Sequence, residues 1–162
     1  MAAHSRGSVS VERLIAAPAA RIFDVLADPT QHPVIDGSGM VREARAERPS
    51  RLSPGATFGM SMRMGVAYAM TNEVVQFDEN RRIAWRPRLA RPAALARFTG
   101  GHVWRYELEP AAAGTRVRES YDWSKADAFT RAYIVGSGWP RRAERAMVKT
   151  LERLDAHVTP GS

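Results

Sequence analysis

The fold of this chain is decided by the stretch from Trp139 to Val158, which reads WPRRAERAMVKTLERLDAHV. Apolar and small residues recur in it every three or four positions, as they do on one face of an α-helix, and charged residues fill the other face. The predicted inner face consists of Trp139, Ala143, Ala146, Met147, Thr150, Leu151, Leu154, His157 and Val158. Such a helix spans about 30 Å, the diameter of a small domain. The rest of the chain must therefore supply one long surface to cover it.

The start of this helix is marked by two signals. Gly136-Ser137-Gly138 provides a flexible turn and a candidate N-cap, and Pro140 suits the first helical turn, where its missing N–H costs nothing.

Composition narrows the class of protein. The chain has 162 residues, no cysteine and a net charge of +7, with 22 arginines and two lysines. The lack of cysteine excludes thiol nucleophiles, Cys-based zinc sites and disulfides, and it agrees with the cytoplasmic location that we expect. The longest apolar run near the start, Leu14–Ala20, contains Pro18 and is too short for a signal peptide or a membrane span. We expect one domain at residues 8–158, between flexible tails at 1–7 and 159–162.

The first quarter of the chain predicts one strand and two short helices. Residues 1–7 are expected to form a disordered leader, and Ser8–Ile15 alternates like a strand. A compact apolar stripe follows Pro18 on a short helix, and Asp28-Pro29 ends this helix and caps a second helical turn that runs through His32. The turn Asp36-Gly37-Ser38-Gly39 comes next.

The middle of the chain is rich in strands. An antiparallel meander is predicted because glycine, proline and asparagine separate these runs at turn positions. A helical period around Ala90–Arg97 is the one exception. Clustered strands followed by a long helix predict an α+β domain with helices on one face of an antiparallel sheet. The predicted strands are Met40–Arg48, Ala56–Met64, Val66–Phe77, Arg82–Arg86, His102–Glu109 and Thr115–Trp123.

Two of these strands alternate cleanly between large apolar and polar residues. Phe58, Met60 and Met62 share one face of the first, and Trp104 and Tyr106 share one face of the other. One face of the sheet is therefore apolar and aromatic, and the other faces water. The last strand adds an exception, because Glu119 falls on the same side as Val117 and Tyr121. If that side is the inner one, a carboxylate points into the domain.

The chain also resembles a known family, the polyketide cyclase/dehydrase and lipid-transport superfamily (SRPBCC, START-like proteins). The resemblance covers about residues 8–158 and concerns framework positions. It implies the helix-grip fold, in which a curved antiparallel sheet wraps a long C-terminal helix and two short helices close one end of an internal cavity. Members include polyketide cyclases and aromatases, carriers of lipids and hormones, and proteins without a known ligand. The matching stretches are Val9–Ile15, Ala17-Pro18, Phe23, Leu26, Asp28-Pro29, His32-Pro33, Ile35–Gly39, Thr71–Val74, Ala84–Arg86, Gly101–Trp104, Tyr106–Pro110 and Tyr121–Trp123.

A ligand-sized cavity between the sheet and the last helix is a prediction that the residues support. Ala143, Ala146 and Thr150 are small, and they face a sheet rich in methionine, whose side chain adapts to irregular guests. The alternative is that the alanines only let the helix and the sheet approach closely. The expected ligand-binding residues are Phe58, Met60, Met62, Tyr68, Met70, Asn72, His102, Trp104, Tyr106, Glu119, Tyr121, Ala143, Ala146, Met147 and Thr150.

Three of these residues are candidates for proton chemistry. A cyclisation or dehydration without a cofactor needs a general acid or base near a carbonyl group, and a donor that holds the enolate oxygen. His102 could carry the proton, Glu119 could assist it, and Tyr121 could be the donor. Alternatively, His102 is hydrogen-bonded near the rim, and Glu119 forms an ion pair with Arg63 or Arg105.

Other chemistries lack their motifs. The four histidines are scattered, so no metal site is predicted. Ser38 and Ser137 lie in Gly-Ser-Gly turns that are not nucleophile elbows, and no glycine-rich nucleotide loop is present. We therefore expect no cofactor.

The arginines provide a rival hypothesis. Arg141, Arg142, Arg145, Lys149 and Arg153 lie along the exposed flank of the last helix, and no acidic residue occurs between Asn80 and Glu107. These concentrations could bind nucleic acid or anionic lipid, or they are simply a hydrated surface. No nucleic-acid module accompanies them, so no specific nucleic-acid partner is expected.

Three functions thus remain in order. The first is binding of a small, largely apolar molecule of the lipid, sterol or aromatic polyketide type by a monomer or weak homodimer that is not an integral membrane protein. The second is a cofactor-free cyclase, aromatase or dehydratase acting in the same cavity. The third is a basic surface-binding protein with a filled core.

Overall fold

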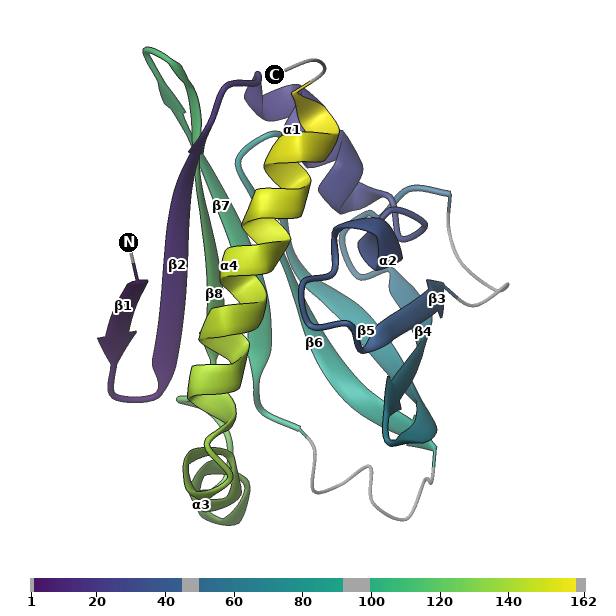
Figure 1. Cartoon of the computed structure of the whole chain (residues 1–162). Coiled ribbons are helices and arrows are strands. Elements are labelled where there is room, and N and C mark those ends of the chain that lie inside the picture. The colour runs from purple at the N-terminus through teal and green to yellow at the C-terminus, as the bar shows by residue number, and fades with distance from the viewer. Residues whose placement is uncertain (1, 45–49, 92–99, 160–162) are drawn as a thin grey trace.

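The computed structural model describes residues 2–44, 50–91 and 100–159. Their strands form one antiparallel eight-stranded sheet in the order β1-β2-β8-β7-β6-β5-β4-β3. Helix α4 crosses one face of this sheet (Figure 1). This is the α+β helix-grip fold that the sequence predicts. The elements are β1 (Ala2–Ser5), β2 (Ser8–Ile15), α1 (Ala19–Ala27), α2 (His32–Ile35), β3 (Val41–Ala44), β4 (Thr57–Met64), β5 (Val66–Asp78), β6 (Arg82–Arg91), β7 (Val103–Ala111), β8 (Gly114–Asp122), α3 (Ala128–Gly136) and α4 (Trp139–Val158).

Helix α4 has the predicted limits. Its N-cap is Gly138, whose φ of 70° is a left-handed conformation that glycine adopts without strain. The buried residues of α4 are Ala143, Met147, Thr150, Leu151, Leu154 and Val158. Trp139 and Ala146 are only partly buried, and His157 is exposed, so the inner-face prediction was wrong for His157. All three lie roughly 80–100° from the centre of the apolar stripe, where a polar imidazole stays hydrated.

The core lies between α4, α1 and the inner face of the sheet. Helix α1 contributes Ile22, Phe23 and Leu26, each of them fully buried. Strand β2 contributes Val9 and Val11, because its alternation places both on the side that meets α4. The sheet therefore supplies the long surface that the last helix requires.

The predicted strands occur in the predicted order, with ends that differ by a few residues. Strand β6 runs on to Arg91, beyond the predicted end at Arg86. The predicted strand from Met40 is seen as β3, and residues 45–49 lie outside the described part. The helical period at Ala90–Arg97 fails at its start, because Ala90 and Arg91 belong to β6. Residues 92–99 lie outside the described part.

Three predictions near the ends of the chain were incomplete. Residues 2–5, expected in a disordered leader, form β1, which pairs antiparallel with the edge of β2. Backbone pairing alone stabilises β1, since its side chains are exposed and leave no hydrophobic pattern. The second short helix, α2, begins at His32 and does not end there.

Helix α3 was not predicted. Its N-cap is Asp127, whose carboxylate accepts a hydrogen bond from the backbone N–H of Thr130 at 3.0 Å. Its large apolar side chains Phe129, Tyr133 and Val135 are exposed, so the segment lacks the buried stripe by which helices are recognised.

Candidate functional site

The inner face of β7 and β8 brings the main candidate residues together. In the register of this pair, Trp104 lies opposite Tyr121 and Tyr106 lies opposite Glu119. Tyr106, Glu119 and Tyr121 are all buried, as alternation from Val117 predicts. The carboxylate of Glu119 therefore does point into the domain.

Glu119 and Tyr106 form a buried polar pair. The Tyr106 hydroxyl donates a hydrogen bond to Glu119 Oε1 at 2.8 Å. Within the described part of the chain, Glu119 Oε2 is buried and has no hydrogen-bond partner. The predicted alternative, an ion pair with Arg63 or Arg105, is therefore wrong. An unpartnered oxygen of this kind is costly to bury and calls for an explanation.

Burial also decides the charge of Glu119. It raises the pKa of this carboxyl group from 4.5 to about 8, against the opposing effect of the Tyr106 hydrogen bond. Burial likewise raises the pKa of Tyr106 well above its ordinary value, and the neighbouring Glu119 adds to the effect. Both groups are thus mainly neutral at pH 7. Since Oε1 accepts from Tyr106, the acid proton of Glu119 belongs on Oε2.

Asp36 adds a negative charge near this pair. After burial, its charge contributes to the raised pKa values of Glu119, Tyr106 and Tyr68. The Asp36 carboxylate accepts hydrogen bonds from the N–H groups of Ser38 and Val41, each at 3.0 Å. The turn at Asp36–Gly39 therefore holds a fixed anion beside the sheet, between α2 and β3.

His102 lies on the same wall, immediately before β7. Its Nδ1 is buried and has no hydrogen-bond partner among the described residues. Burial lowers the pKa of His102 to about 4, so the ring is neutral at pH 7. Its centroid lies 5.4 Å from that of Tyr121, which lies 4.7 Å from that of Trp104.

Trp139 connects this wall to α4. Burial raises the pKa of Tyr121, and a hydrogen bond with the Trp139 side chain opposes the shift. Trp139 is the first residue of α4, so this contact joins the start of the helix to β8. The sequence places Trp139 on the inner face of the helix but contains no signal for this contact.

The second wall comes from β4 and β5. Phe58, Met60 and Asn72 are buried, and Met62, Tyr68 and Met70 are partly buried. Strand register joins them, because Phe58 lies opposite Asn72, Met60 opposite Met70 and Met62 opposite Tyr68. The predicted set thus forms one continuous apolar surface. Its members are Phe58, Met60, Met62, Tyr68, Met70 and Asn72.

Helix α4 forms the opposite side. Ala143 and Met147 are buried, and Ala146 is partly buried. The Thr150 hydroxyl accepts a hydrogen bond from the N–H of Gly37 at 2.9 Å, so this predicted ligand contact already has a structural partner. The sequence analysis missed His32 and Trp85, which stack with centroids 5.0 Å apart between α2 and β6. Alternation with Ile83 on β6 was the available signal for Trp85.

No group of three His, Asp or Glu that could hold a metal ion occurs in residues 2–44, 50–91 and 100–159. In the same residues, no helix is both long and apolar enough to cross a membrane.

The sequence model of the family described as "Polyketide cyclase / dehydrase and lipid transport" matches residues 6–159. The chain belongs to this family. The uncharacterized protein Rv0088 of Mycobacterium tuberculosis is 36% identical over 159 residues, a match that covers 96% of this chain and 66% of that protein. The chain thus spans about two thirds of the length of the curated relatives that it matches.

Solved structures share the fold of this family member. A Chromobacterium violaceum protein, CV1439, has a TM-score of 0.71 at 18% identity, over 96% of this chain and 99% of that one. Ms6760 from Mycobacterium smegmatis has a TM-score of 0.69 at 21% identity, over 97% and 98%. Ginseng major latex-like protein 151 has a TM-score of 0.68 at 14% identity, over 95% and 98%. At these identities the likeness shows the fold alone.

Proposed function

We propose that this protein binds a small, largely apolar molecule that carries an uncharged oxygen acceptor, such as a ketone, ester or quinone carbonyl. The observation that carries the proposal is the Tyr106–Glu119 pair, whose Oε2 is buried without a partner among the described residues. A ligand oxygen that accepts a hydrogen bond from Oε2 would satisfy this group.

The surroundings of the pair favour an apolar ligand body. Aromatic and methionine side chains cover the sheet on both sides of it, and Met147 and Ala143 face it from α4. Surfaces of this kind, with a few polar groups inside them, are typical of sites for small molecules. Family membership agrees with ligand binding between the sheet and the last helix.

Charge separates neutral ligands from acids. The neutral carboxyl group of Glu119 can donate to a carbonyl group, but Asp36 makes the region electrically negative. No cation of the described residues contributes to the pKa of Glu119. A ligand carboxylate would therefore lose its hydration without gaining a counter-charge. We expect esters and ketones to bind more tightly than the corresponding free acids.

Displacement of the uncharged dye Nile red tests this selectivity. The matched pairs are palmitate against methyl palmitate, and anthraquinone-2-carboxylate against anthraquinone. At pH 7 we expect the neutral member of a pair to compete at least about tenfold better, the effect of one charge-assisted or lost polar contact. Competition by neither member, or stronger competition by both acids, would contradict the proposal.

Two substitutions of Glu119 sharpen the same experiment. Glu119→Gln keeps a neutral donor at this position and should keep most of the affinity for the neutral ligand at pH 7. Glu119→Leu removes the donor and should weaken binding about tenfold or more. Equal affinity in the Leu variant would remove Glu119 from the binding site.

Catalysis without a cofactor is the second candidate function. It is favoured by the opposite pKa shifts of two buried groups on one wall, downward at His102 and upward at Glu119. In this hypothesis neutral His102 takes a proton from the carbon beside a ligand carbonyl, while Glu119 gives its proton to the carbonyl oxygen and leaves an enol. Turnover should then be lost in both His102→Ala and Glu119→Gln with ligand affinity nearly unchanged. Retained turnover in either variant removes that residue from the mechanism.

A further inference from the structure

One end of the molecule carries most of the exposed apolar side chains. Nine large apolar side chains are exposed in the described residues, and five of them lie on α3 or beside the β4–β5 turn. Figure 1 shows that α3, the start of α4 and this turn all lie at the lower end of the molecule. The five residues are Met64, Val66, Phe129, Tyr133 and Val135.

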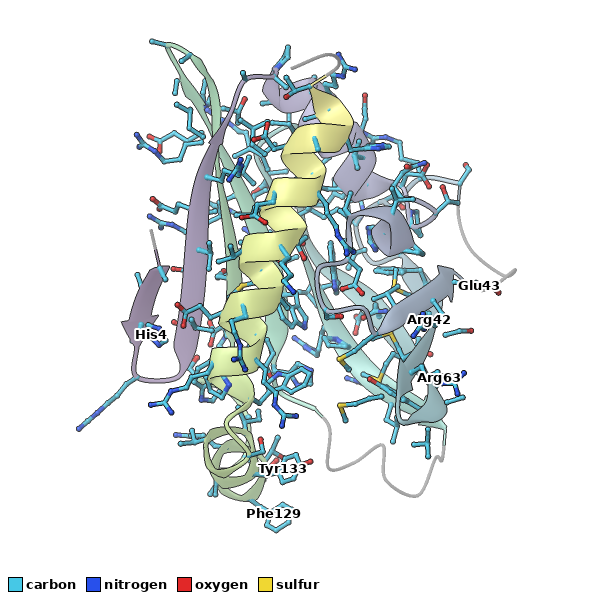
Figure 2. The ribbon with its side chains drawn as sticks, in the orientation of Figure 1. His4, Arg42, Glu43, Arg63, Phe129 and Tyr133 are labelled. Carbon is cyan, nitrogen blue, oxygen red and sulfur yellow. The ribbon has the colours of Figure 1, made fainter. Side chains whose placement is uncertain are left out.

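Helix α3 presents its aromatic face to the solvent. Phe129 and Tyr133 are four residues apart and so share one face of the helix, where they are 71% and 68% exposed. Figure 2 shows both side chains projecting from α3 at the end where Arg63 lies on β4. The opposite face of α3 buries Ile134 and Thr130. Aromatic side chains of this kind are enriched at the interface between a bilayer and water.

The same end has an excess of positive charge. The segment from Lys125 to Arg145 contains five cations and only two carboxylates. Both carboxylates are engaged, because Asp127 accepts from Thr130 and Glu144 pairs with His4 at 3.0 Å. The five cations are Lys125, Arg131, Arg141, Arg142 and Arg145.

The outer face of the sheet is different. There Arg118 forms ion pairs with Glu12 and Glu107, and Arg82 forms one with Glu107 at 3.3 Å. Within the described part of the chain, Arg141, Arg142 and Arg145 form no ion pair. The uncompensated positive charge of the protein thus coincides with its exposed aromatic side chains.

We propose that this end, formed by α3, the first turns of α4 and the β4–β5 turn, is a docking surface for an anionic lipid bilayer. The apolar side chains insert at the level of the headgroups, and the arginines lie against lipid phosphates. Trp139 lies where this surface meets the wall that carries Tyr121. Docking here would bring the proposed ligand site close to a source of apolar molecules, although the docking surface rests on its own observations.

Sedimentation with lipid vesicles tests the docking surface. Wild-type protein should bind vesicles of phosphatidylcholine mixed with phosphatidylglycerol, bind pure phosphatidylcholine far more weakly, and dissociate as salt increases. The double variant Phe129→Ser/Tyr133→Ser should lose affinity at least about tenfold. Val66→Ser, in a separate element, should weaken binding in the same direction. Arg141→Ala/Arg142→Ala should reduce both the affinity and its dependence on salt.

Leu14→Ser/Val34→Ser is the matched control. These two side chains are 52% and 54% exposed but lie on β2 and α2, outside the docking surface. The control should bind vesicles as the wild type does. Circular dichroism checks that each variant is folded, and Val66→Ser reports on the surface without altering α3.

Several results would overturn the proposal. They are absence of wild-type binding at low salt, equal binding to both kinds of vesicle, and unchanged binding by the Phe129/Tyr133 variant. A wild-type dimer that this variant converts to a monomer, without vesicle binding, would assign the surface to self-association. Dye displacement by methyl palmitate on the same variants should be unchanged, so failure of docking and failure of ligand binding are distinguishable.

Discussion

At the scale of single residues, burial acts on Glu119 and His102 in opposite ways. It disfavours the charged form of each, so it raises the pKa of the acid and lowers the pKa of the base. The result is a neutral donor and a neutral imidazole on one apolar wall at pH 7. This state suits recognition of an uncharged ligand, and it makes the stability of the fold depend on pH.

The sign of this dependence can be worked out for Glu119. In the unfolded chain the carboxyl group loses its proton near pH 4.5, whereas in the folded protein it keeps the proton up to about pH 8. Between these values the folded state holds more protons, so stability falls as pH rises. The stabilising contribution of the neutral acid is complete below pH 4.5 and is lost as pH rises through 8.

Glu119→Gln should remove this contribution. Between pH 5 and pH 9 we expect the wild type to lose about 3 kcal/mol more free energy of unfolding than the variant does. Urea titrations at both pH values measure the difference, and the double comparison cancels other titrating groups. Glu152→Gln, on the exposed face of α4, is the control and should follow the wild type. Parallel curves for Glu119→Gln and the wild type would contradict the burial of a neutral acid.

At the scale of elements, the contact between the Asp36–Gly39 turn and α4 positions one end of the site. A Cβ atom on Gly37 would lie 2.2 Å from the carbonyl oxygen of Ala146 and 2.5 Å from the N–H nitrogen of Thr150. Only a glycine lets the turn come this close to the helix. The N–H of Gly37 then reaches the Thr150 hydroxyl, which fixes the turn that carries Asp36.

Gly37→Ala should therefore separate α2 from α4. We expect a loss of about 2 kcal/mol or more in the free energy of unfolding, because the clash involves backbone atoms that cannot rotate away. Gly136→Ala is the matched control, since a Cβ atom there meets nothing within 4 Å and alanine favours the helix. Chemical denaturation of both variants measures the effect. Equal stabilities would show that the turn can move without cost.

At the scale of the whole molecule, the charges and the apolar surfaces are separated. Ion pairs cover the outer face of the sheet, the inner face is largely apolar, and free cations gather with aromatic side chains at the α3 end. This distribution explains why the net charge of +7 alone was ambiguous. Part of the arginine content is neutralised across strands, and the remainder has a definite location.

Much of the fold and part of the site follow from local pattern. The limits of α4, the inward direction of Glu119 and the apolar face of Phe58 and Met60 all follow from helical and strand periodicity. Helix α3 and β1 were missed because their side chains are exposed and leave no such pattern. Thr150 was predicted as a ligand contact, but its hydroxyl is used by Gly37, a residue far away in the sequence.

The sequence by itself determined which side chains lie on the covered faces, because a helix repeats every 3.6 residues and a strand every two. It therefore predicted the last helix, the strands that cover it and a carboxyl group directed inward. Only the tertiary structure decided what that carboxyl group meets. Strand register placed Tyr106 opposite Glu119, and burial determined its charge. Pairing across strands and desolvation depend on residues that are distant in the chain, so no local pattern contains them.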